Sequence, residues 1–150
     1  MFQKVINSSN SKTTILIRLM VGSVFLSEGI QKFLFPAIRG AGRFENIGLP
    51  SPEFLGAFVG AFEIVCGVLI LIGLLTRLAS ILTLIIMLVA VVTTKSEVFI
   101  NDGFWAMMHG SRTDWAMLLG SLFLIIKGSG NWSIDFYLLY NQKLNKFGNL

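Results

Sequence analysis

The sequence predicts an all-α integral membrane protein, an antiparallel four-helix bundle followed by a C-terminal interfacial amphipathic segment. Of its 150 residues, 54% are hydrophobic and 13% are charged, whereas soluble domains carry about 25% charged residues. The mean hydropathy is +0.75. The apolar residues gather in runs close to the roughly 20 helical residues needed to cross about 30 Å of hydrocarbon. We therefore expect residues 1–150 to form one membrane domain.

The first predicted span covers residues 14–35. It ends before Pro36, because proline lacks an amide donor and disfavours a helical conformation in the residue before it. The apolar run is longer than the core of a signal peptide, and no small-residue cleavage site follows it. We therefore expect this helix to be retained.

The second and third spans are predicted over residues 53–75 and 78–94. Ser51 can cap the second span, and Pro52 suits its first helical position. The very short turn at Thr76–Arg77 makes the two spans antiparallel neighbours.

The last part of the chain is predicted to contain one more span. Residues 96–112 mix aromatic and charged side chains and are expected to form a loop against the membrane surface. A capping-box pattern from Ser111 to Asp114 starts the fourth span, 112–127, which is only about 24 Å long at 1.5 Å per residue. The aromatic-rich residues 132–140 are expected to lie among the lipid headgroups, with a polar tail after them.

Lysine and arginine residues near the span ends set the expected orientation, because cytoplasmic loops carry more of them. Six lie on the side of the termini (Lys4, Lys12, Arg77, Lys127, Lys143, Lys146) and four on the other (Arg39, Arg43, Lys95, Arg112). Both termini are therefore expected in the cytoplasm. Arg18 is expected to snorkel to the same surface as an anchor, and the role of Arg77 is left open.

Residue counts exclude several kinds of chemistry. The only cysteine, Cys66, excludes an internal disulfide, a dithiol pair and a thiolate metal cluster, and is expected to be a small buried residue. The only histidine, His109, excludes a haem held by two histidines of this chain. With no flavin or metal motif and no basic cluster among aromatics, neither a metal nor a nucleic acid is an expected ligand.

Ionisable residues inside the predicted spans are the candidate site, because a charge near the bilayer centre costs at least about 2.5 to 3.5 kcal/mol. Glu28 and Lys32 are four positions apart on one face of the first span, with Gln31 beside them. Glu63 lies in the middle of the second span, at a comparable depth in the outer half of the membrane.

Glycines share the helix face of Glu63. Gly56, Gly60 and Gly67 fall within about 60° of it at 100° per residue. Such a face either lets a neighbouring helix approach closely or leaves room for a flat ligand. The sequence leaves both alternatives open.

The short fourth span is expected to begin below the membrane surface. Its start would bring three more polar residues toward the acids of the first two spans: Arg112, Asp114 and His109. We therefore expect one polar cluster.

Two interpretations of this cluster are open. In the structural one, Glu28 pairs with Lys32 and Glu63 pairs with Arg112, and the pairs only fix helix packing. In the functional one, the cluster binds a ligand or handles protons, as intramembrane ionisable residues commonly do.

The order of the polar motifs is similar to that of a known family. The motifs are Arg18, Glu28-Gly29-x-Gln31-Lys32, Gly48-Leu49-Pro50, Glu63-x-x-x-Gly67, Gly73-x-x-Thr76-Arg77 and Arg112-Thr113-Asp114-Trp115. Over residues 14–136 the chain resembles the DoxX family. The resemblance implies a small four-span protein of the bacterial inner membrane, related to the membrane subunit of a thiosulfate:quinone oxidoreductase and linked to oxidative defence. It also implies functional roles for Gln31, Lys32, Glu63 and Arg77.

The leading interpretation is a membrane subunit of a quinone-linked oxidoreductase, with the quinone head group in an outer pocket between the first, second and fourth spans. Glu28, Lys32 and Glu63 are the expected catalytic residues: an acid exchanges protons and a cation stabilises a reduced oxygen. The residues expected to line the head group are Gln31, Gly60, Gly67, His109, Arg112 and Asp114. Electrons must come from a protein partner, because the chain has no redox motif of its own.

The alternative is a non-catalytic scaffold or assembly factor that holds a partner protein at the bilayer. The charged outer loop and the C-terminal segment would be its docking features. Transport is disfavoured, because residues 78–90 of the third span offer almost no polar side chain. A homo-oligomer is compatible with either interpretation.

Overall fold

A computed structural model describes the backbone of residues 11–147 and the side chains through Asn141. This part of the chain is helical and contains no strand. The helices are α2 (Thr14–Leu34), α3 (Ala41–Asn46), α4 (Pro52–Ile72), α5 (Thr76–Gly110), α6 (Arg112–Lys127) and α7 (Ile134–Phe147). The predicted all-α membrane fold is confirmed. Lys4, used above for orientation, lies outside the described residues.

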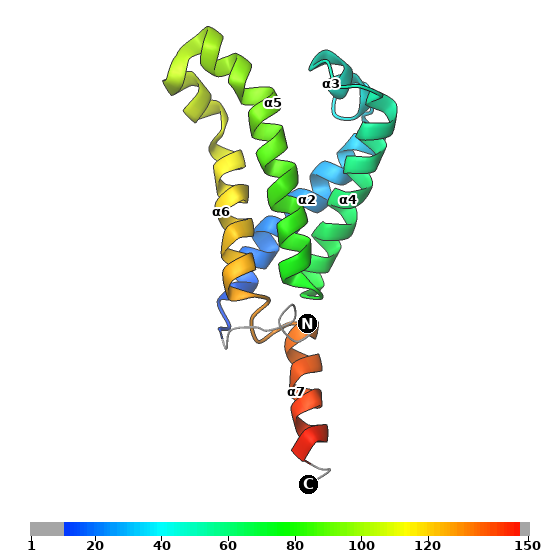
Figure 1. The fold of residues 1–150 in the computed structure, drawn as a ribbon, viewed down its shortest axis with the longest axis vertical. Coiled ribbons are helices and arrows are strands. Elements are labelled where there is room, and N and C mark those ends of the chain that lie inside the picture. The colour runs from blue at the N-terminus through cyan, green and yellow to red at the C-terminus, as the bar shows by residue number, and fades with distance from the viewer. Residues whose placement is uncertain (1–10, 148–150) are drawn as a thin grey trace.

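Three helices, α2, α4 and α5, are long and apolar enough to cross a membrane. The fourth helix of the bundle, α6, has 16 residues and the predicted bounds. Two helix pairs make up the bundle: α2 packs on α4 and α5 packs on α6, while α4 touches α5 and α2 touches α6. In Figure 1, α5 and α6 rise side by side to a shared tip, and α4 leans away from them toward α3.

Glycines set the close approach of α2 and α4. A Cβ atom on Gly67 would lie 2.9 Å from the carbonyl oxygen of Gly22, and one on Gly29 would lie 2.7 Å from that of Gly60. Both distances are shorter than a real Cβ contact allows. The space that a side chain would need at each glycine is therefore occupied by the backbone of the other helix. Of the two alternatives for the glycine face, close helix packing is the one found.

The buried core is small and lies where the two helix pairs meet. It contains Val21, Phe25, Cys66, Ile70, Ala79, Met117 and Leu124. Large apolar side chains such as Leu16, Val92 and Ile126 are more than 60% exposed along the helices. An apolar exterior around a small core is typical of helices whose solvent is lipid.

The predicted surface loop over residues 96–112 is wrong. α5 continues to Gly110 and breaks only at Gly103, whose φ of 84° and ψ of 176° lie outside the helical region. The helical part before this break, residues 76–102, spans about 40 Å at 1.5 Å per residue, more than about 30 Å of hydrocarbon. The loss of apolar character after residue 95 therefore does not mark the end of the helix.

The α4–α5 turn and the C-terminal segment also differ from expectation. The α4–α5 turn is formed by Gly73, Leu74 and Leu75, because Gly73 adopts a φ of 72° and ends α4. The tail expected after residue 140 is instead helical through Phe147. α7 leaves the bundle along the long axis of the bundle (Figure 1). The predicted position of this segment among the lipid headgroups is not tested by the structure and stays a prediction.

Candidate functional site

The centre of the candidate site is an ion pair between two membrane-spanning helices. Lys32 Nζ of α2 lies 2.5 Å from Glu63 Oε2 of α4, and the two side chains are only 10% and 6% exposed. The helices can place these groups together because Gly60 has no side chain: a Cβ there would lie 3.2 Å from Lys32 Cβ. The glycine face therefore positions the acid against its partner.

Two further charges act on the Glu63 carboxylate, from Glu28 on α2 and Arg43 on α3. Together with the ion pair they form a group of two acids and two bases, which we call the outer charge cluster (Glu28, Lys32, Arg43, Glu63). Arg43 was missed as a site residue because it lies in a Gly/Pro-rich connector. Nothing local in that segment indicates that it folds back over the ends of α2 and α4.

The expected Glu28–Lys32 pair is replaced by Lys32–Glu63. Among the described residues, the ion pairs are Lys32–Glu63 and Lys95–Asp114. Glu63 is 5% exposed, whereas Glu28 is half-buried. An unpaired buried carboxylate destabilises the fold more than a partly hydrated one. Pairing Lys32 with Glu63 therefore stabilises the protein more than pairing it with Glu28.

Gln31 stays on its own helix. Its side-chain nitrogen donates to Ser27 Oγ at 3.0 Å, one turn earlier on α2. It borders the outer charge cluster in sequence without bonding to it in the described contacts.

The residues at the start of α6 form a separate group. Asp114 lies 3.3 Å from Lys95 Nζ, which also donates to the carbonyl oxygen of Gly110 at 2.8 Å. Arg112 and His109 are exposed at the α5–α6 turn. The expected single cluster is therefore divided in two, because the extension of α5 carries the start of α6 to its own partner, Lys95.

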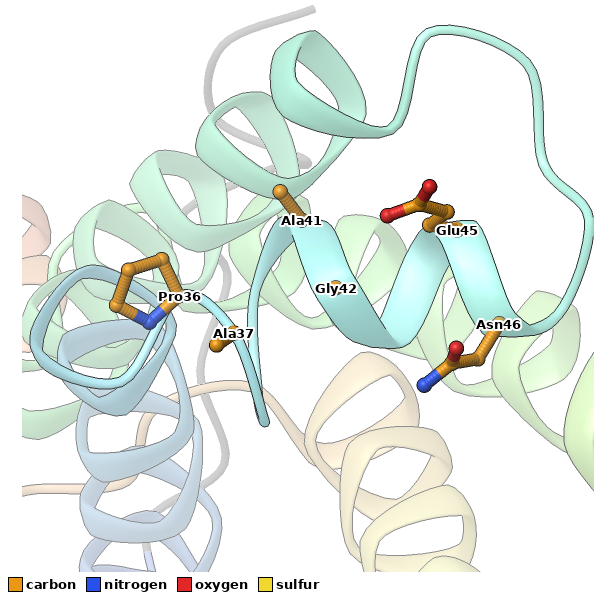
Figure 2. A pocket seen from close by; sticks show the side chains of 6 residues that line it. All are labelled: Pro36, Ala37, Ala41, Gly42, Glu45 and Asn46. Carbon is orange, nitrogen blue, oxygen red and sulfur yellow. The ribbon is translucent and has the colours of Figure 1, made fainter.

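A pocket of about 410 Å³ lies on the connector between α2 and α4 (Figure 2). It is lined by Pro36, Ala37, Ala41, Gly42, Glu45 and Asn46. Its side-chain polar atoms come from Glu45 and Asn46 of α3 (Figure 2). This connector packs on the last turn of α2, since a Cβ on Gly40 would lie 2.5 Å from the carbonyl oxygen of Lys32.

The prediction that Arg18 snorkels to the membrane surface is wrong. Its side chain is 2% exposed, and its guanidinium donates to the carbonyl oxygens of Ile70 and Leu71 in α4 and of Ser129 and Trp132 after α6. Four carbonyl acceptors replace the water that a snorkelling arginine would seek, so burial is compensated.

Arg77, whose role the sequence left open, bonds a helix end. Its guanidinium donates to the carbonyl oxygen of Ile126 at 3.0 Å, in the last turn of α6. A cation at this position satisfies a free carbonyl and complements the negative end of the helix dipole.

Comparison with known proteins gives one family. The DoxX family model matches residues 13–96. The chain is 49% identical over 138 residues to a Mycobacterium tuberculosis protein named "Uncharacterized membrane protein Rv3486", covering 88% of this chain and 85% of that protein. It is 30% identical to a Bacillus subtilis protein named "Putative oxidoreductase CatD", covering 91% of this chain and 95% of that protein. No solved structure matches the chain.

Proposed function

We propose that this chain, which belongs to the DoxX family, is the membrane subunit of a quinone-linked oxidoreductase system, with Lys32 and Glu63 as its proton-handling pair. The observation that carries the proposal is the ion pair itself, buried between two membrane-spanning helices. Each charge placed there costs at least about 2.5 to 3.5 kcal/mol on insertion scales. A pair needed only for packing is often replaceable by apolar residues at no loss of stability, which favours a chemical use.

The name of the Bacillus subtilis relative, an oxidoreductase, supports redox chemistry as the general class. The outer charge cluster gives a reason for a quinone in particular. A quinone, when bound, takes up two electrons and two protons, so its site needs groups that exchange protons inside the membrane. Glu63 and Glu28 are carboxylates at this depth, and Lys32 is the cation beside them.

The pocket over α3 is where we place the head group. The glycine face is closed by packing between α2 and α4, so Gly60 and Gly67 leave no space for a ring. The pocket has a volume of about 410 Å³ and is widely open to the exterior, so a head group would enter it without a change in the fold, and Asn46 supplies an amide donor for a carbonyl oxygen. Asn46 would orient the head group and the outer charge cluster would exchange its protons.

Electrons would come from a protein partner, since the sequence carries no flavin, haem or metal motif. We further propose that the protein lies in a bacterial inner membrane with its termini in the cytoplasm. The outer charge cluster then faces the opposite side, because Lys32 is in the last turn of α2 and Arg43 is in α3, and α3 lies at the end of the bundle away from α7 (Figure 1).

The test is quinone-dependent turnover in membranes that contain the complete system. Glu63→Gln and Lys32→Met are expected to lower the turnover per molecule of assembled protein at least tenfold. The matched control is Glu97→Gln, which removes an exposed carboxylate from the α5–α6 tip and should leave turnover unchanged. Full turnover in Glu63→Gln would remove this pair from the mechanism.

A second candidate function is a non-catalytic scaffold. The observation that favours it is a set of exposed aromatic residues near the α5–α6 turn and on α7: Trp105 is 82% exposed, and Tyr137 and Tyr140 are 64% and 55% exposed. Aromatic side chains of this kind are enriched in protein interfaces.

The two functions make opposite predictions for the same variants. A scaffold should lose its co-purifying partner when Trp105 or Tyr137 is replaced by serine, and should keep it when Glu63 is replaced by glutamine. A quinone-linked subunit should lose turnover in Glu63→Gln whether or not the aromatic residues are intact.

A further inference from the structure

We infer that the segment after α6 is an intramolecular strap, in which Asp135 supplies the N-terminal cap that α5 lacks and Arg18 holds the same turn from its other side. The strap is defined here as residues 128–135. Through it α7 becomes a fixed extension of the bundle. The inference rests on different residues from the proposed redox function and stands independently of it.

The start of α5 has no cap of its own. The residue in the N-cap position is Leu75, which has no polar side chain and adopts a φ of 50°. The first amides of a helix need acceptors from outside the helix. The Asp135 carboxylate provides two such acceptors: its Oδ1 accepts from the Leu75 amide at 2.8 Å and its Oδ2 accepts from the Thr76 amide at 3.1 Å.

Asp135 also binds the other side of the turn. Its backbone amide donates to the carbonyl oxygen of Gly73 at 2.9 Å. One residue, about 60 positions along the chain from this turn, therefore contacts the end of α4 and the start of α5. Its side chain is 1% exposed, and a negative charge is favourable at the positive end of the α5 dipole.

Arg18 ties the strap to α4. Its guanidinium donates to the carbonyl oxygens of Ile70 and Leu71 in the last turn of α4, and also to those of Ser129 and Trp132 in the strap. The Ile70 carbonyl oxygen accepts in addition from the Gly73 amide at 3.2 Å. The turn must leave space for the guanidinium, since a Cβ on Gly73 would lie 2.7 Å from Arg18 Cζ. Attraction between Arg18 and Asp135 links the two groups.

The strap continues directly into α7. The Ser133 hydroxyl donates to the carbonyl oxygen of Gly130 at 2.6 Å and accepts from the Phe136 amide at 3.1 Å. This serine caps the first turn of α7 while Asp135, in the same turn, caps α5. The direction in which α7 leaves the bundle (Figure 1) is thereby fixed to the α4–α5 turn.

The strap couples the position of α7 to the packing of the bundle. Any protein that binds α7 and shifts it must also disturb Asp135, the α4–α5 turn and Arg18. A deletion that begins at residue 132 would remove the cap of α5 together with α7, so loss of a partner in such a deletion would not identify α7 as the binding surface.

Hydrogen exchange of the full-length chain in detergent tests the strap. In Asp135→Ala the amides of Leu75 and Thr76 should exchange about tenfold faster than in the wild type, the size expected for the loss of a capping side chain. The matched control is Asp102→Ala, which removes an exposed carboxylate from α5 and should leave both amides protected. Equal protection in Asp135→Ala and the wild type would overturn the inference.

A second variant covers the case in which Asp135→Ala does not fold. Asp135→Asn keeps the shape and one acceptor oxygen, so it should lose protection at one of the two amides and retain it at the other. Full protection of both amides in this variant would show that the carboxylate is not their acceptor, and the strap would be rejected.

Discussion

Lys32 Nζ and Glu63 Oε2 lie 2.5 Å apart between two helices of the bundle, each side chain at most 10% exposed. The contact depends on the crossing of α2 and α4 at Gly29 and Gly60, where no side chain separates the backbones. It joins residues 31 positions apart in the chain. The predictions below concern this pair and the packing that surrounds it.

Breaking the Lys32–Glu63 pair from one side should be more harmful than removing both charges. Loss of one partner from a buried pair costs about 3 to 5 kcal/mol, because an uncompensated charge stays buried. Thermal unfolding in detergent should therefore show a large loss for Lys32→Met and a smaller one for Lys32→Met combined with Glu63→Leu. Equal losses in the single and double variants would show that the two charges are not coupled.

The glycines between α2 and α4 should not tolerate a methyl group. Gly29→Ala places its Cβ 2.7 Å from the Gly60 carbonyl oxygen, and such overpacking typically costs about 1 to 3 kcal/mol. Gly110→Ala is the matched control, because the nearest atom to its Cβ would be Lys95 Nζ at 3.9 Å. A Gly29→Ala protein as heat-stable as Gly110→Ala would contradict the close crossing.

Arg18 should not be replaceable by lysine. The guanidinium donates to four carbonyls in two segments, and an ammonium group cannot reproduce that planar arrangement. Leaving buried carbonyls without donors costs about 1 to 3 kcal/mol each, so Arg18→Lys should lower the unfolding temperature markedly. Arg77→Lys, at a site with one carbonyl contact, should have little effect, and a reversed order would refute this assignment.

The Lys95–Asp114 pair should contribute little and depend on salt. Its side chains are 21% and 26% exposed, more than those of the Lys32–Glu63 pair, although Asp114 Oδ2 itself is buried; pairs that water reaches are worth about 0 to 1 kcal/mol. Asp114→Asn should reduce stability slightly at low ionic strength and not at all at about 1 M salt, where the Debye length is about 3 Å. A large, salt-independent loss would indicate that the charge is shielded from solvent.

Local patterns in the sequence predicted the helices well where a residue type marks their ends. Pro36 and the capping pattern at Ser111 gave the bounds of α2 and α6 closely. The end of α5 was placed too early because the hydropathy of a segment indicates whether it suits the membrane, not whether the helix continues beyond it. Ser111 itself does not cap α6 through its side chain, and its hydroxyl instead donates to the Met107 carbonyl at 2.7 Å.

The sequence indicated the two residues of the buried ion pair but not their pairing. Glu63 and Lys32 were identified because charges are costly in hydrocarbon, yet a spacing of four residues on one helix favoured Glu28 as the partner of Lys32. The partners Arg43 and Asp135 lie in a connector and a short C-terminal helix, and only the folded chain brings them to α4 and α5. Pairings of this kind depend on how helices cross, which no local pattern encodes.

The most direct test of the proposed function is the binding of a short-chain quinone to the detergent-purified chain by isothermal titration calorimetry. We predict saturable binding to the wild type and to the control Glu97→Gln, weakened at least tenfold in Glu63→Gln and Asn46→Ala, with all four proteins equally folded. Binding of equal strength in all four, or no saturable binding to the wild type, would contradict a quinone site in the pocket over α3 and favour the scaffold.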